Sequence, residues 1–265
     1  MSVQSNRDFF EEQGYLVIED LLTPTELEVC RGEIDRLHQV AADLEVSGSD
    51  LAQFQHEPHA AATQRDDGLP LLRKVEGTRD VSDVFRDLSA HQRLVPIIQE
   101  LIGDDLLLFR STLMLKPAHH GSAHALHQDS AYWPMDPPTL VTVSIALNDS
   151  SPENGCIQVI PGSHKWGLQD WGKITTAEDK VTSRDDIDLS TRIDVPLRAG
   201  SVVCFHSLMV HGSGPNQSPN PRNTALYAYF SPQVRYAPKE GQPRQKTFPV
   251  ITGLGGETDW TMTAD

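Results

Sequence analysis

A change of periodicity near Asp105 constrains the fold of this 265-residue chain more than any other feature. Apolar residues recur at helical spacing before this point, and extended segments separated by turns follow it. The alternation is explicit in residues 140–148, where one face carries Val141, Val143, Ile145 and Leu147 and the other carries Thr142, Ser144 and Ala146. This pattern is typical of a strand that lies between a packed interior and a more polar environment.

Six segments after Asp105 are candidate strands: 106–116, 140–148, 156–160, 193–197, 201–205 and 224–230. Many short strands after a helical N-terminal third predict a mainly β fold with flanking helices, a jelly roll or β-sandwich rather than a parallel βαβ array. We expect a single domain over 1–265. Its sections are a helical part over about 1–104, a jelly-roll core over about 105–230 and a C-terminal tail over 231–265.

The N-terminal third carries clear helix signals. Thr23 as N-cap, Pro24 in the first helical position and Glu26 as the capping-box partner predict the start of a long helix. Residues 45–68 lose periodicity and predict a long loop, which either lies over a site or is disordered. The other elements expected here are a helix over 7–14, strands over 15–18 and 71–75, and two short helices within 81–102.

Charge and composition exclude several classes of partner. The chain has 22 Lys and Arg against 37 Asp and Glu, a net charge of −15, which disfavours binding to nucleic acid or anionic lipid. No apolar stretch approaches the roughly 20 residues of a membrane span, and the first residues lack the features of a signal peptide. We therefore expect a cytoplasmic protein with a small-molecule substrate.

The sharpest local motif is His127-Gln128-Asp129, although a His-x-Asp triple alone is common by chance. A second histidine, His211, follows the strand expected over 201–205 and stands in a glycine-containing segment that we expect to be a tight loop. Two histidines and one carboxylate bind ferrous iron on one face and leave positions open for ligands. A structural zinc site would fill four positions, usually with thiolates, and the three cysteines have no suitable spacing.

A buried cation could complete such a site. Arg222 continues the alternation of strand 224–230 and shares a face with Thr224 and Leu226. A guanidinium fork in that place suits the far carboxylate of a 2-oxo acid, and the Ser213 hydroxyl could bind the same carboxylate. A surface ion pair is the alternative for Arg222.

These motifs together resemble the phytanoyl-CoA dioxygenase (PhyH) family of iron(II)- and 2-oxoglutarate-dependent oxygenases. The resemblance extends from Phe9 to about Phe230. Its specific parts are Leu126-His127-Gln128-Asp129 with Tyr132-Trp133-Pro134, Glu153-Asn154-Gly155-Cys156 with Val159-Ile160-Pro161-Gly162-Ser163-His164-Lys165, and His211-Gly212-Ser213-Gly214 with Arg222. The resemblance implies a double-stranded β-helix, which is a distorted jelly roll.

The resemblance also implies a role for each matching residue. It makes His127, Asp129 and His211 the catalytic iron ligands, and it makes Arg222 and Ser213 the clamp for 2-oxoglutarate. It further suggests cosubstrate contacts from Lys74, Thr112 and Gln128, and an apolar one from Ile145, which stands where a relative has tryptophan. The implied reaction uses O2 and releases succinate and CO2 while an unactivated C–H bond is hydroxylated. The carboxylate at Asp129 favours hydroxylation, desaturation or ring formation over halogenation.

Two other functions stay open at this point. One is a metal-binding jelly roll that binds a small molecule without turnover. The other is a cupin-like isomerase or hydrolase that uses zinc or manganese and needs no 2-oxoglutarate. The residues do not define the primary substrate or the oligomeric state.

Overall fold

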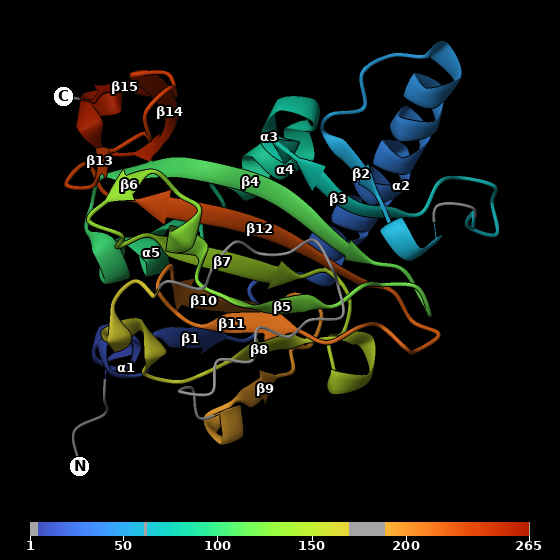
Figure 1. Ribbon diagram of the computed structural model, residues 1–265, viewed down its shortest axis with the longest axis horizontal. Coiled ribbons are helices and arrows are strands. Elements are labelled where there is room, and N and C mark those ends of the chain that lie inside the picture. Colours follow the sequence, from blue (N-terminus) through green and yellow to red (C-terminus); the bar gives the residue numbers. More distant parts are fainter. Residues whose placement is uncertain (1–4, 61–62, 170–188, 265) are drawn as a thin grey trace.

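The computed structural model describes residues 5–60, 63–169 and 189–264, which form two layered antiparallel sheets with helices packed outside (Figure 1). The nine-stranded major sheet has the order β1 (Tyr15–Ile18), β10 (Val202–His206), β7 (Val141–Ala146), β12 (Arg222–Phe230), β4 (Leu106–Lys116), β14 (Gln245–Thr252) and β15 (Asp259–Thr263). Strand β3 (Leu72–Glu76) also pairs with β4, and β2 (Phe54–His56) pairs with β3. This arrangement confirms the predicted jelly roll with flanking helices.

The minor sheet has four strands in the order β5 (His124–His127), β11 (His211–Ser213), β8 (Ile157–Val159) and β9 (Ile193–Val195). A two-stranded ribbon joins β6 (Met135–Asp136) and β13 (Arg235–Tyr236). Short 3₁₀ turns connect these strands and the helices at Pro58–Ala60, Asp129–Ala131, Pro152–Asn154, Ser163–Trp166, Leu189–Thr191 and Leu254–Gly256. The space between the two sheets is where the candidate site lies.

The helices cover the face of the major sheet that turns away from the minor sheet. They are α1 (Asn6–Gln13), α2 (Pro24–Ser47), α3 (Thr78–Val81), α4 (Asp83–Leu88) and α5 (Val95–Ile102). Helix α2 begins with the predicted capping box, in which Thr23 Oγ1 accepts from Glu26 N at 3.3 Å and Glu26 accepts from Thr23 N at 2.7 Å. Its buried face, which includes Ile34 and Leu37, belongs to the same core as Val143 and Ile145 of β7.

Alternation along β12 divides the two faces of the major sheet. Ala225, Tyr227 and Tyr229 belong to the helix-side core. The opposite face carries Arg222, Thr224 and Leu226 along a cavity, and further on Ala228 and Phe230 in a second apolar cluster. One face of β12 therefore borders the cavity over part of its length and packs into an apolar cluster over the rest.

Several predicted elements are confirmed, and others need correction. Strand 106–116 has the bounds expected from the sequence, and the alternation in β7 places its apolar side in the core. The segment 45–68 is not one long loop, because α2 continues to Ser47 and the short strand β2 follows. Residues 231–264 contain β13, β14 and β15, and β14 extends the major sheet beside β4. Within the described residues, no helix is long and apolar enough to span a bilayer.

Candidate active site

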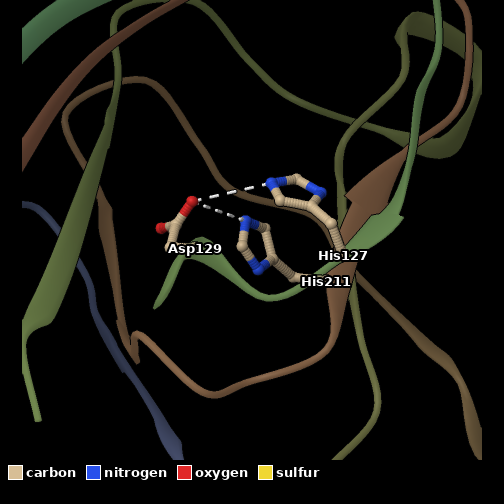
Figure 2. Close-up of side chains that lie close together, drawn as sticks. All are labelled: His127, Asp129 and His211. Carbon is tan, nitrogen blue, oxygen red and sulfur yellow. Dashed lines mark ion pairs between the residues drawn. The ribbon is translucent and has the colours of Figure 1, made fainter. Parts of the chain in front are cut away.

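Two histidines from neighbouring strands and one aspartate converge between the sheets (Figure 2). His127 ends β5 and His211 begins β11, and the two residues are register partners, so their ring centroids lie 4.3 Å apart. His211 therefore stands in a paired strand and not in the tight loop expected from its glycines. The Asp129 carboxylate turns back from the 3₁₀ turn after β5, and its Oδ1 lies 3.6 Å from His127 Nε2 and 3.8 Å from His211 Nε2.

Hydrogen bonds behind the three side chains fix which atoms face one another. His127 Nδ1 lies 2.8 Å from the Ala125 carbonyl, and His211 Nδ1 lies 3.0 Å from the Met209 carbonyl. Because a carbonyl only accepts, each Nδ1 carries the proton and each Nε2 keeps its lone pair for a metal. Thr142 Oγ1 donates to Asp129 Oδ2 at 2.7 Å, which leaves Oδ1 turned toward the imidazoles.

The electrostatics of these groups suit a cation. Burial opposes ionisation of Asp129, but the neighbouring His211, His127 and Thr142 lower its pKa to about 2. Burial, and then the charge of His127, lowers the pKa of His211 to about 4, which favours the neutral imidazole that binds metals. Burial also opposes the charge on His127, but the hydrogen bond and charge of Asp129 outweigh it and raise the pKa of His127.

The donor set fits a ferrous ion with open positions. In the parts of the chain that the structure describes, these three residues form the single cluster of three or more His, Cys, Asp or Glu ligand atoms. Two imidazole nitrogens and one carboxylate oxygen on a common face are the ligands of non-haem iron(II) oxygenases.

A cavity of about 170 Å³ opens beside the three ligands, and Lys74, Thr112, Ser213 and Arg222 line it as expected. The Arg222 guanidinium is buried, and its Nε has no hydrogen-bond partner among the described residues. Burial lowers the pKa of Arg222 to about 10. A buried donor without an acceptor is costly, so the wall of this cavity is complete only with a bound acceptor such as a carboxylate.

Two residues expected from the resemblance to contact the cosubstrate lie elsewhere. Ile145 faces the helix-side core with Val143, because side chains alternate along β7 and Ser144 is the neighbour that points into the cavity. Gln128 is fully buried, and its Nε2 donates to the carbonyls of Gly167 at 2.9 Å and Leu208 at 2.7 Å. Neither Gln128 nor Ile145 is among the residues that line the cavity, and their contacts to the cosubstrate stay predictions from the resemblance.

The structure also adds residues to the site that the sequence analysis did not assign. His124, Arg110 and Ser144 line the cavity, and Ser144 Oγ has no hydrogen-bond partner among the described residues. Arg110 stands two positions before Thr112 on β4, so the same alternation could have identified it. A larger groove of about 700 Å³ over α2 and residues 117–120 contains none of the predicted site residues.

A jelly roll with an open facial site of two histidines and one aspartate defines a class of metal-binding β proteins that includes non-haem iron oxygenases. Residues 10–224 match the family described as phytanoyl-CoA dioxygenase (PhyH), and the chain belongs to this family.

Individual relatives agree with this assignment. Human peroxisomal phytanoyl-CoA dioxygenase is 26% identical over 94% of this chain and 74% of its own. The ectoine dioxygenase of Nocardia farcinica (strain IFM 10152) is 29% identical over 84% of this chain and 76% of its own. Among solved structures, the apo form of the non-haem monooxygenase ThoJ superposes with a TM-score of 0.73 at 25% identity, covering 96% of this chain and 86% of that one.

Proposed function

We propose that this protein is an iron(II)- and 2-oxoglutarate-dependent dioxygenase that hydroxylates an unactivated C–H bond of a small organic molecule. Membership of the PhyH family and relatives named as dioxygenases support the reaction class. The observation that carries the proposal is that one cavity holds both the three-residue facial site and the buried Arg222, whose Nε has no hydrogen-bond partner in the described part of the chain.

The bound ion and cosubstrate would supply the oxidising chemistry, by coupling decarboxylation of 2-oxoglutarate to activation of O2. His127, Asp129 and His211 would hold iron(II) through three atoms, and the backbone carbonyls of Ala125 and Met209 would keep both imidazoles in the binding tautomer. Arg222 and Ser213 would bind the distal carboxylate of 2-oxoglutarate, and Thr112 and Lys74 would add contacts on the same wall. The apolar side chains of Ile157, Phe205 and Leu226 would exclude water around the reacting groups.

The test is an anaerobic titration of the purified protein with iron(II) and then 2-oxoglutarate. A metal-to-ligand charge-transfer band should appear with both additions, and exposure to air should then release succinate. A screen of succinate release over acyl-CoA thioesters, amino-acid-derived solutes and phosphonates would identify the primary substrate. Absence of both the band and succinate release would contradict the proposal.

The two alternatives predict other results. A binding protein without turnover would give the band, yet it would consume no O2 with any compound. An isomerase that uses zinc or manganese would act without 2-oxoglutarate. We favour the dioxygenase because the relatives matched over most of the chain are named as dioxygenases, and because an isomerase without 2-oxoglutarate would leave Arg222 Nε with no partner among the described residues.

We also propose that residues 1–265 act as one domain, since β1, β3, β7 and β14, from all three sections of the chain, join the same sheet. The cytoplasmic location stays a prediction from the sequence.

A further inference from the structure

An ion cluster on the cavity wall contains two residues, Arg110 and Glu76, that have no role in the reaction described above. Arg110 Nη2 lies 2.6 Å from Glu76 Oε1, and Arg110 Nε donates to Glu76 Oε2 at 3.3 Å and to Thr112 Oγ1 at 3.0 Å. Lys74 Nζ also pairs with Glu76 Oε1. Two cations therefore share one carboxylate, and the cluster keeps a net charge of +1 in a chain whose net charge is −15.

Strand register explains why these groups meet. Lys74 and Glu76 are alternate residues of β3, and Arg110 and Thr112 are alternate residues of the neighbouring β4. Lys74 pairs with Met114 and Glu76 pairs with Thr112, so all four side chains project from one face of two adjacent strands. That face is the cavity wall, because Lys74, Arg110 and Thr112 all line it.

The register also separates Arg110 from the cosubstrate clamp. Across β12, Lys116 pairs with Arg222 and Arg110 pairs with Ala228. Six residues along a strand span roughly 20 Å, so the backbones of Arg110 and Arg222 lie at opposite ends of the cavity wall. A five-carbon diacid held by Arg222 and the metal is too short to make Arg110 its second anchor.

One edge of the Arg110 guanidinium can still donate hydrogen bonds to a ligand. Its Nε and Nη2 face Glu76 and Thr112, whereas Nη1 has no hydrogen-bond or ion-pair partner within the described part of the chain. The side chain is 30% exposed and lines the cavity. The metal ligands His127, Asp129 and His211 line the same cavity.

We propose that Arg110 is a substrate-recognition residue and that the primary substrate carries an oxyanion, either a carboxylate or a phosphonate, which the free edge of its guanidinium binds. The inference rests on the proposed function. Glu76 partly neutralises the guanidinium and competes with a bound anion for it, and Lys74 adds a second positive charge beside it. Planar guanidinium groups bind such oxyanions through paired hydrogen bonds, so the anion would orient the rest of the substrate toward the iron.

The test measures succinate release from the iron-loaded enzyme with matched compounds that share one carbon skeleton: hexanoic acid, hexylphosphonic acid and hexanamide, and phenylacetic acid, benzylphosphonic acid and phenylacetamide. At least one anion should stimulate release about tenfold more than its amide, and the acid and phosphonate arms tell which oxyanion is preferred. R110Q should raise the KM for that anion about tenfold or more, because the fork is lost. R235Q, which changes an exposed arginine of β13, is the matched control and should leave this KM unchanged.

A second variant separates recognition from a structural role. E76Q removes the carboxylate that competes for Arg110, so it should lower the KM for the anion severalfold, whereas loss of a purely structural ion pair would only impair the enzyme. The inference is wrong if amides stimulate as well as anions, if R110Q keeps the preference for anions, if E76Q raises the KM, or if no anion in the panel stimulates the wild type. Each of these results leaves intact both the charge-transfer band and the succinate release on exposure to air, whereas failure of the proposed function removes one or both of them.

Discussion

The two halves of β12 present opposite environments on the same inner face. Arg222, Thr224 and Leu226 face a cavity, and the buried Arg222 Nε has no hydrogen-bond partner among the residues that the structure describes. Further along, Ala228 and Phe230 belong to an apolar cluster with Trp133, Tyr236 and Phe248. Alternation decides which side chains face inward, but the polarity of those side chains decides whether the interior is filled or kept open.

The difference separates stability from function along one strand. The aromatic end gains stability from buried area and from ring contacts such as the edge-on pair of Phe230 and Phe248, whose centroids lie 5.0 Å apart. The cavity end keeps a charged group out of water, which costs stability until a ligand binds. Substitutions at the aromatic end should therefore lower stability, whereas substitutions at the cavity end should weaken ligand binding without lowering stability.

The largest effect is expected at the metal ligands. D129A should lower succinate release coupled to product at least about 100-fold, because a carboxylate ligand is lost from a three-residue site. The charge-transfer band measured anaerobically should weaken in parallel. D136A, which changes an exposed aspartate of β6, is the control, and undiminished turnover in D129A would refute the ligand assignment.

A large effect on stability is expected at the aromatic end. F230A should lower the free energy of unfolding by about 3–5 kcal/mol, since it opens a cavity in a fully buried cluster. Urea unfolding followed by circular dichroism measures the change, and F230L should cost much less. A loss below about 1 kcal/mol in F230A would show that this cluster collapses around the deleted ring.

Substitution of Arg222 should weaken cosubstrate binding without lowering stability. R222M should raise the apparent KM for 2-oxoglutarate about 10- to 100-fold, because the charge-assisted hydrogen bonds to the distal carboxylate are lost. Its free energy of unfolding without ligand should stay the same or rise by about 1 kcal/mol, since a buried unpaired charge is removed. Steady-state kinetics measure the change in KM, and urea unfolding measures the change in stability. An unchanged KM would show that another cation binds the cosubstrate.

A pH-dependent effect on stability is expected from Lys116, a fully buried neighbour of Arg222 whose Nζ donates to the carbonyls of Ser122 and Gly214. Burial, followed by the charges of Arg222 and Arg73, lowers the pKa of Lys116 to about 6. Between pH 6 and the ordinary lysine pKa near 10, the unfolded chain binds more protons at this residue than the folded protein, so the Lys116 contribution to stability rises with pH.

K116M removes this contribution. The difference between its free energy of unfolding and that of the wild type should therefore shift in favour of the wild type from pH 6.5 to pH 9. Parallel urea titrations at the two pH values measure the shift, and K239M, at a position without a buried side chain, is the control. A difference that does not change with pH would show that Lys116 titrates normally.

Local patterns in the sequence predicted much of the fold. Alternation predicted the strand 106–116 and the apolar face of β7 that packs into the helix-side core. The capping box predicted the start of α2. These signals depend only on residues close together in the chain. The strand β11 was missed, since three residues with a glycine carry no alternation and depend on β5 and β8 for their pairing. The C-terminal strands β14 and β15 were missed because prolines and glycines in that segment favour turns.

The residues of the site likewise divide into those that the sequence predicted and those that only the fold placed. Motif spacing singled out His127, Asp129, His211 and Arg222, since each residue type has a limited set of roles beside a metal or a carboxylate. Alternation along β4 and β7 could have assigned Arg110 to the face of Thr112 and Ile145 to the face of Val143, whereas the burial of Gln128 against Gly167 and Leu208 depends on the tertiary structure.

By itself, the sequence determined the kinds of chemical group available and the local periodicities that make strands and helices. The tertiary structure alone decided that His127 and His211 are register partners 84 positions apart and that Arg110 and Arg222 occupy opposite ends of one wall. The physical reason is that pairing between strands distant in the chain depends on packing of the whole core, and a shift of one residue would turn every one of these side chains to the other face.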